Sequence, residues 1–212
     1  MQPMLSTLLR RSTLASALGL TLLLANGMVQ AADAPPKPMG VRGSITALNG
    51  DDLKVHTTRG EDLTIHLASD ATVRAVTLGT LDEIKQGSYI GTAAVPQADG
   101  SLKALEVHVF PPELAGTGDG HRPFDLAPNS SMTNGSVGEL KVANGRTLTL
   151  TYKGGEKKVF VPEDVPIVNL GPGDRSLLTP GTKIVLFAQK AEDGTLTAKS
   201  VSAGKDGVKP PM

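Results

Sequence analysis

The sequence predicts an all-β protein of two tandem, five-stranded barrels, each with a short helix between its third and fourth strands. Three observations support this prediction. Short segments of alternating apolar and polar residues are separated by glycine-containing turns. Segment 41–110 shares its pattern with segment 135–204. A connector rich in Gly, Pro, Asn and Ser, 111–134, lies between them, and it contains no alternating run of its own.

The first 31 residues have the pattern of a secretory signal peptide. Arg10 and Arg11 precede an apolar run over 14–25, and small residues lead to Ala31. The apolar run is much shorter than the roughly 20 residues that a membrane span needs, which disfavours an anchor. We therefore expect cleavage after Ala31, a Pro-rich linker over 32–40, no membrane span in the mature chain, and a periplasmic or secreted location.

The charge balance argues against a nucleic-acid partner. The chain has 21 Lys and Arg against 21 Asp and Glu, and two of the basic residues lie in the predicted leader, so the mature chain is slightly acidic. Nucleic-acid binding usually needs a basic footprint. The sequence has no cysteine, which excludes disulfides, cysteine-ligated zinc and thiol chemistry. Each domain must therefore be stabilised by its own core.

Segment 41–110 predicts five strands. The first covers 41–48 and ends at the turn dipeptide Asn49-Gly50, and the next two alternate over 53–58 and 63–67 across Gly60. A short helix follows over 80–87, with Thr80 and Glu83 at capping-box spacing and Gly87 as the stop. Strands over 89–95 and 102–110 complete the set. Three strands, a helix and two strands is the order of the OB-fold, a partly open Greek-key barrel; a small β-sandwich is the alternative.

Segment 135–204 repeats this pattern. The turn Asp99-Gly100 recurs 94 residues later as Asp193-Gly194. At the same offset, turn glycines and inward positions agree, which indicates a tandem duplication. The helix is shorter in this copy, because Pro180 confines it to about one turn after the cap residue Asp174. Residues 205–212 form a C-terminal tail.

These motifs carry a resemblance. The pattern is Gly-x-Ile/Val, Asn-Gly, a hairpin, Leu-x-x-Ile/Leu-x-x-Gly and then Asp-Gly-x-Leu-x-Ala-x-x-Val, and the connector adds Gly-His-Arg-Pro-Phe-Asp over 120–125 and Ser-Met-Thr-Asn over 131–134. The pattern resembles a bacterial exported domain-of-unknown-function family of tandem OB-like β-barrels. The resemblance covers nearly the whole mature chain. It implies fold and location, and it brings no chemistry.

His56 and His66 are the candidate metal ligands. Both lie on the polar face of the predicted hairpin, and a hairpin centred near Gly60 would put them on neighbouring rungs, where they could share a divalent metal. No carboxylate alternates with them, so solvated surface histidines are the favoured interpretation. His108 has the same interpretation on the last strand of the segment.

The connector holds the candidate ligand-binding residues, His121, Arg122, Asp125 and Asn129. Polar residues in loops between rigid elements are where binding sites commonly lie. We expect the connector to be ordered, to pack between the barrels through Phe124, and to bring these residues together. The alternative is that Arg122 and Asp125 simply pair with the flanking barrels.

Enzyme signatures are missing, so the sequence predicts a non-enzymatic binding or interaction protein. Segment 135–138 lacks the pattern of a nucleophile elbow, and the glycines of 116–120 are followed by no phosphate-loop lysine. The expected partner is an unidentified envelope protein or a small ligand, with no cofactor. The alternative function is a periplasmic metal-binding accessory that uses the surface histidines.

Overall fold

The structure, a computed structural model, describes residues 38–142 and 146–211, and the predicted leader lies outside them. This part of the chain is all-β: thirteen strands join in a single sheet, and its three helical segments are 3₁₀ turns of three residues each. None of its helices has the length and apolar character needed to cross a bilayer.

The strands are numbered along the chain. They comprise β1 (Met39–Asn49), β2 (Asp52–Thr57), β3 (Asp62–Leu78), β4 (Tyr89–Pro96), β5 (Leu102–Ala104), β6 (Val107–Val109), β7 (Gly120–Pro123), β8 (Ser131–Val142), β9 (Arg146–Tyr152), β10 (Gly155–Val161), β11 (Ile167–Pro172), β12 (Lys183–Lys190) and β13 (Leu196–Gly204). The 3₁₀ turns are η1 (Leu81–Glu83), η2 (Pro112–Leu114) and η3 (Arg175–Leu177).

Five strands form a closed, mixed barrel in the order β13-β12-β1-β2-β3. Its neighbours are antiparallel except for β3 and β13, which run parallel and close the ring. Alternation decides which side chains face inward: Leu53, Val55, Ile65 and Leu67 are all at most 1% exposed. Together with apolar residues of β1, β12 and β13 they make one continuous core.

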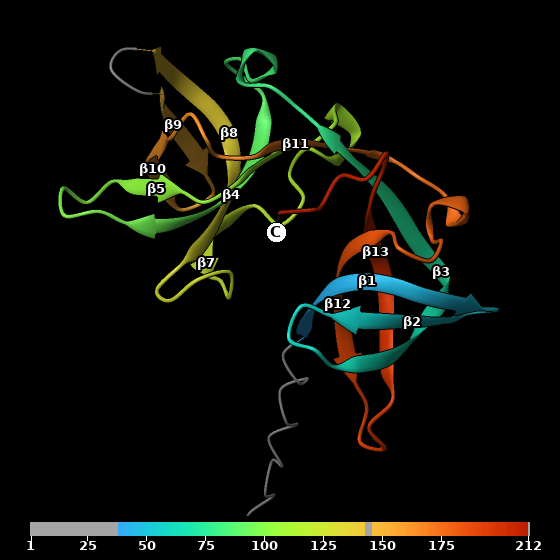
Figure 1. The fold of residues 1–212 in the computed structure, drawn as a ribbon. Helices are drawn as coiled ribbons and strands as arrows, with labels where there is room; N and C mark the ends of the chain where they lie inside the picture. The colour runs from blue at the N-terminus through green and yellow to red at the C-terminus, as the bar shows by residue number, and fades with distance from the viewer. Residues whose placement is uncertain (1–37, 143–145, 212) are drawn as a thin grey trace, which may run out of the picture. The chain divides into compact units, whose positions relative to one another are not determined.

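The barrel takes its strands from both predicted segments. Segment 41–110 supplies β1, β2 and β3, and segment 135–204 supplies β12 and β13. Figure 1 shows β1 and β2, near the start of the colour scale, beside β12 and β13 at its red end. Segment 41–110 therefore does not close this barrel alone, and its own later strands, β4 to β6, pair elsewhere.

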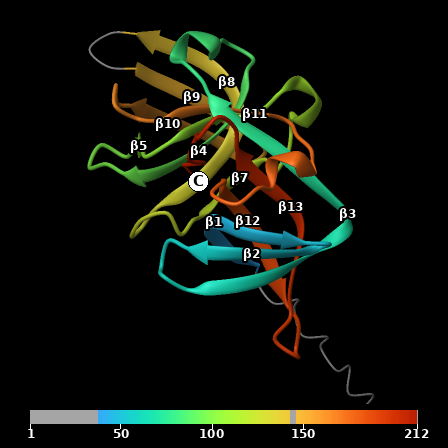
Figure 2. The same cartoon turned by 45° about the vertical axis from the view of Figure 1, so that its right-hand side comes forward.

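A second group of strands is built around β4, β5, β8, β9 and β10 (Figure 2). β4 pairs with β5 and β8, β8 with β9, β9 with β10, and β10 with β5. This group encloses a separate core in which Ile90, Leu148, Leu150, Val159 and Val161 are fully buried.

Two further strands connect the barrel with the second group. β3 continues beyond the barrel and pairs antiparallel with β11, and β11 pairs in parallel with β6. A small third core forms beside this pairing, from Val76, Tyr89, Phe110, Val168 and Leu170. The tilted rings of Tyr89 and Phe110, 5.2 Å apart, are part of it.

The helix predicted over 80–87 is wrong in type: only Leu81–Glu83 is helical, as one 3₁₀ turn. The predicted capping carboxylate is present, because Glu83 Oε2 accepts a hydrogen bond from the Thr80 backbone N–H at 3.0 Å. Two turns of isolated helix are costly to nucleate. The chain instead buries both Leu81 and Ile84 in the core of the second group and turns at Gly87, whose φ is 86°.

Candidate functional site

The two predicted metal ligands are farther apart than expected. In the β2–β3 pairing, His56 lies opposite Asp62 and His66 lies opposite Asp52, so the histidines are on rungs four residues apart. This separation is about 13 Å along the strand. Contrary to the expectation that no carboxylate alternates with them, each Nδ1 pairs with a facing carboxylate, at 2.8 Å for Asp62 and 3.0 Å for Asp52. The expected neighbouring rungs are therefore wrong, and the register gives the two rings no shared ion.

His121 lies on β7, the edge strand that pairs with β8. Its Nδ1 is 2.8 Å from the Thr133 hydroxyl, and its ring stacks on Tyr152 at a centroid distance of 6.2 Å. Partial burial lowers the pKa of His121 below its ordinary value, and the nearby Lys157 ammonium lowers it further. Both effects favour a neutral imidazole.

The other connector candidates lie elsewhere. Arg122 donates a hydrogen bond to the Gly118 carbonyl oxygen at 2.7 Å. Asp125 accepts two from the Arg42 guanidinium, at 2.8 and 3.1 Å, and these hold the pKa of Asp125 below its ordinary value although burial opposes them. Asn129 has a left-handed φ of 59°. The four predicted ligand-binding residues therefore do not converge on one site.

The connector nevertheless packs against the barrel. The Phe124 ring is 6.4 Å from the Phe187 ring of β12, and the Arg42 guanidinium of β1 lies 5.4 Å from its centre. Such a cation–aromatic contact is favourable. The Arg42–Asp125 ion pair lies beside it and joins the same two segments.

A buried polar cluster on β4, β6 and β8 is absent from the sequence predictions. Glu106 is fully buried and accepts hydrogen bonds from the Ala93 backbone N–H at 2.7 Å and from His108 Nδ1 at 3.0 Å. His108, expected on a solvated face, is 2% exposed. A buried carboxylate persists when it is paired and hydrogen-bonded, and this pair meets that condition.

The cluster continues across Gly91. The backbone of Gly91 pairs with both His108 and Asn134, and a side chain at this position would collide with His108 Nε2 and Asn134 Oδ1. Asn134 Nδ2 donates to the Thr117 carbonyl oxygen at 3.0 Å, which fixes the orientation of the amide. Asn134 Oδ1 is the one buried side-chain polar atom, in the part of the chain that the structure describes, without a hydrogen-bond partner.

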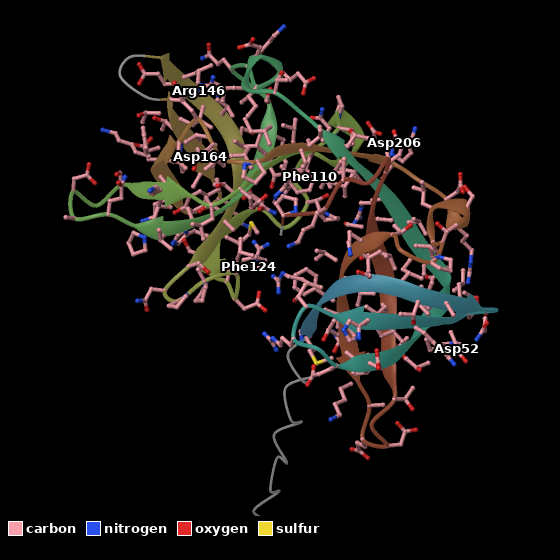
Figure 3. All side chains as sticks on the ribbon, in the orientation of Figure 1. Asp52, Phe110, Phe124, Arg146, Asp164 and Asp206 are labelled. Atoms are coloured by element: carbon pink, nitrogen blue, oxygen red, sulfur yellow. The ribbon has the colours of Figure 1, made fainter. Side chains whose placement is uncertain are left out.

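This cluster borders a cavity of about 140 Å³ between the second group and the outer face of the barrel. Figure 3 labels Phe110 and Phe124, two of its aromatic walls. The lining residues are Arg74, His108, Phe110, Arg122, Phe124, Met132, Asn134, Leu170, Val185, Leu186, Phe187, Ser200 and Ser202. Apart from the titratable His108, the charged members of this lining are two arginines. Of the four predicted ligand-binding residues, only Arg122 is part of this lining.

The hydrogen bond with Glu106 orients the imidazole of His108. With its Nδ1 proton donated to Glu106, His108 presents Nε2 as an acceptor when neutral and as a donor when protonated. A serine nucleophile needs a hydrogen bond to its base. In residues 38–142 and 146–211, no hydrogen bond joins His108 to the hydroxyl of Ser200 or Ser202, although both serines line the cavity.

A larger groove of about 620 Å³ lies at the start of β1 and β12. It contains the Arg42–Asp125 pair, Arg59, Lys183 and Lys209. Lys183 donates to the Ser44 hydroxyl at 2.6 Å. Two cationic side chains of this groove, Arg42 and Lys183, therefore already form hydrogen bonds within the protein.

Metal ligands do not cluster in the described residues, where no group of three or more His, Asp or Glu could hold an ion. Comparisons with known proteins add no assignment: no family model, no curated protein and no solved structure matches the chain.

Proposed function

We propose that this protein is an exported, non-enzymatic binding protein whose small ligand occupies the cavity lined by His108, Phe110 and Asn134. The observation that carries the proposal is a preformed cavity of about 140 Å³ whose lining combines aromatic walls with a few polar and cationic side chains. Next to this cavity, Asn134 Oδ1 is the one buried side-chain polar atom of the described residues without a partner, and no hydrogen bond joins His108 Nε2 to those residues. Unsatisfied buried polar atoms are rare and costly, and they are typical of sites that bind something.

The cavity also has the composition of a ligand site. Small-molecule sites are mostly apolar with a few placed polar groups. Phe110, Phe124 and Met132 supply apolar walls, while His108 and Asn134 supply polar groups held by other hydrogen bonds. The walls come from the barrel and from the second group, so the space depends on how the two pack.

We further propose that the second group is itself a barrel and that the chain arose by duplication, with OB-like barrels that exchange their last two strands. Its support is the pairing of β4, β5, β8, β9 and β10, which leads from each strand to the next and back to β4. In the closed barrel, β12 and β13 of the second segment complete β1 to β3 of the first.

The strand registers support the duplication. At the offset of 94 residues, Val76 corresponds to Leu170, and these two residues pair with each other in the β3–β11 ladder. Equivalent strands that pair antiparallel at equivalent residues are related by a local two-fold axis. The pairing of Val73 with Val201 likewise has its counterpart in Val107 with Ile167.

Export, the remaining element, depends on the N-terminal pattern, which lies outside the described residues. The sequence contains no cysteine, so an exported form of this protein has no disulfide to stabilise it. The three apolar cores supply that stability instead.

The proposal is tested by screening the full chain, by ligand-observed NMR, against single-ring compounds of acidic, basic and neutral character. We expect at least one class to bind, and we expect Ser202→Leu, which fills the cavity from β13, to abolish binding. Thr197→Leu lies on the same strand outside the cavity and serves as the control. Absence of binding by every class, or binding that Ser202→Leu leaves intact, would overturn the proposal.

A further inference from the structure

We infer that the ligand of the cavity is a small carboxylic acid with a single ring or a branched apolar body. This inference rests on the proposed function, because it names the chemistry of the compound that the cavity would hold.

The charges of the lining select an anion. Arg74 projects from β3 and Arg122 from β7, and the lining contains no Asp or Glu. Glu106 is fully buried behind His108 and accepts hydrogen bonds from that ring and from the Ala93 N–H. The cavity therefore contains positive charge that its own walls do not neutralise.

The cationic groups have unused hydrogen-bond donors. Arg122 donates through Nη1 to the Gly118 carbonyl oxygen, which orients the guanidinium and leaves its other N–H groups for a ligand. The Arg74 side chain has no hydrogen bond or ion pair with the described residues; on β3, Arg74 lies opposite Pro172 of β11 and Ser202 of β13. Guanidinium groups bind carboxylates through paired, charge-assisted hydrogen bonds, which favours a carboxylate over a neutral amide.

The hydroxyls of Ser200 and Ser202 line the wall that β13 contributes. Hydroxyl groups rotate and can donate to a carboxylate oxygen. The corresponding positions 94 residues earlier are Glu106 and His108. On the β6 side, His108 alone lines the cavity and Glu106 lies behind it, whereas the β13 wall carries two neutral hydroxyl donors.

The remaining walls and the volume set the body of the ligand. Phe110, Phe124 and Met132 provide apolar surface, and the His108 ring packs edge-on against Phe110 at a centroid distance of 5.0 Å. A cavity of about 140 Å³ is close in size to the ~150 Å³ apolar cavity that holds one benzene molecule. A benzoate-sized or cyclohexanecarboxylate-sized acid fits this space, whereas a fused-ring compound exceeds it.

Isothermal titration calorimetry of the full chain with benzoate, cyclohexanecarboxylate, benzamide and benzylamine tests the inference. We expect the two carboxylates to bind and the amide and amine to bind at least about tenfold more weakly, since a hydrogen bond to a charged group is worth roughly a factor of ten or more. Arg74→Met and Arg122→Met should each weaken carboxylate binding by about tenfold. Lys199→Met, on the exposed face of β13, should leave it unchanged.

The outcomes separate this inference from the proposed function. If benzamide or benzylamine binds as tightly as benzoate, the cavity is a ligand site and the carboxylate assignment is wrong. If the arginine variants melt at the wild-type temperature and still bind benzoate at wild-type affinity, the assignment also fails. If neither carboxylate binds while another compound class binds in the wider screen, only the carboxylate assignment is lost.

Discussion

Replacing His108 with serine should destabilise the protein strongly, because it leaves a buried carboxylate without its main partner. Serine is the residue that occupies the corresponding position 94 residues later, at Ser202. Glu106 has no exposed surface and would keep only the Ala93 N–H as a donor. Removing the partner of a buried carboxylate costs about 3–5 kcal/mol, because the carboxylate is left uncompensated. We expect a loss of this size for His108→Ser.

The double variant Glu106→Ser/His108→Ser should be more stable than the single variant His108→Ser. It removes the buried charge and leaves the Ala93 N–H without its acceptor, which costs about 1–3 kcal/mol. Glu106→Ser alone leaves two donors unsatisfied, at His108 and Ala93, for about 2–6 kcal/mol. The double-mutant cycle should therefore show a coupling energy of at least about 2 kcal/mol.

Urea unfolding at neutral pH, followed by circular dichroism, measures all four free energies of unfolding. The exposed pair of His66 and Asp52 is the control, because both side chains are about half exposed. Its cycle should give less than about 1 kcal/mol. Additive effects at Glu106 and His108, with coupling no larger than that of the exposed pair, would refute the argument that the buried carboxylate depends on the histidine.

Three more outcomes are expected. Gly43→Ala should lower the free energy of unfolding by about 1–3 kcal/mol, because its Cβ would lie 2.3 Å from a backbone carbonyl oxygen of β2. Gly171→Ala is the control: it has open space around it and should change this free energy by no more than about 0.5 kcal/mol. Thermal melts of the two variants compare them. The folded pKa of Asp125 lies below its unfolded value, so its pairing with Arg42 stabilises the protein at neutral pH, by at most about 1 kcal/mol, and this contribution is lost as the pH falls through the folded pKa. Asp125→Asn should therefore be less stable than wild type at pH 7, and the difference should vanish as the pH falls through the folded pKa of Asp125, in acid unfolding titrations. Mass spectrometry of the exported protein should find Ala32 at its N-terminus, and an uncleaved leader would contradict the expected signal peptide.

The strand content follows from local patterns. Leu53, Val55 and Ile65 alternate with polar neighbours, and all three are buried as the alternation requires. The turn glycines Gly50 and Gly100 have φ values of 61° and 82°, which is the left-handed backbone that the turn dipeptides predict. These features are set within a few residues, so a single sequence contains enough information to predict them.

The completion of the β1–β3 barrel by β12 and β13 could not be predicted from those patterns. Strands 94 residues apart carry the same apolar residues: Leu102 and Leu196 are both buried, as are Ala104 and Ala198. The strands β1 to β3 could therefore be completed by the last strands of either segment. The choice depends on how the connecting segments run, which the alternation does not encode.

The buried cluster escaped prediction for a related reason. Glu106 and His108 alternate with Val107, which is the pattern of an outward, solvated face. Alternation along a strand shows that two side chains lie on the same face of the sheet. It does not show whether other parts of the protein cover that face. Here the connector and the barrel cover it. The available signal was that serines replace this pair in the second segment.

The closed barrel combines strands from the two ends of the described chain, and this has a consequence for how the chain folds. The ladder that closes it joins residues more than a hundred positions apart, such as His66 with Thr197. Contacts of such sequence separation close large loops, and proteins dominated by them have high contact order and fold slowly. The barrel cannot close until the last strand has been synthesised. A cut in the connector would therefore leave halves that stay interlocked, since each contributes strands to the same ring.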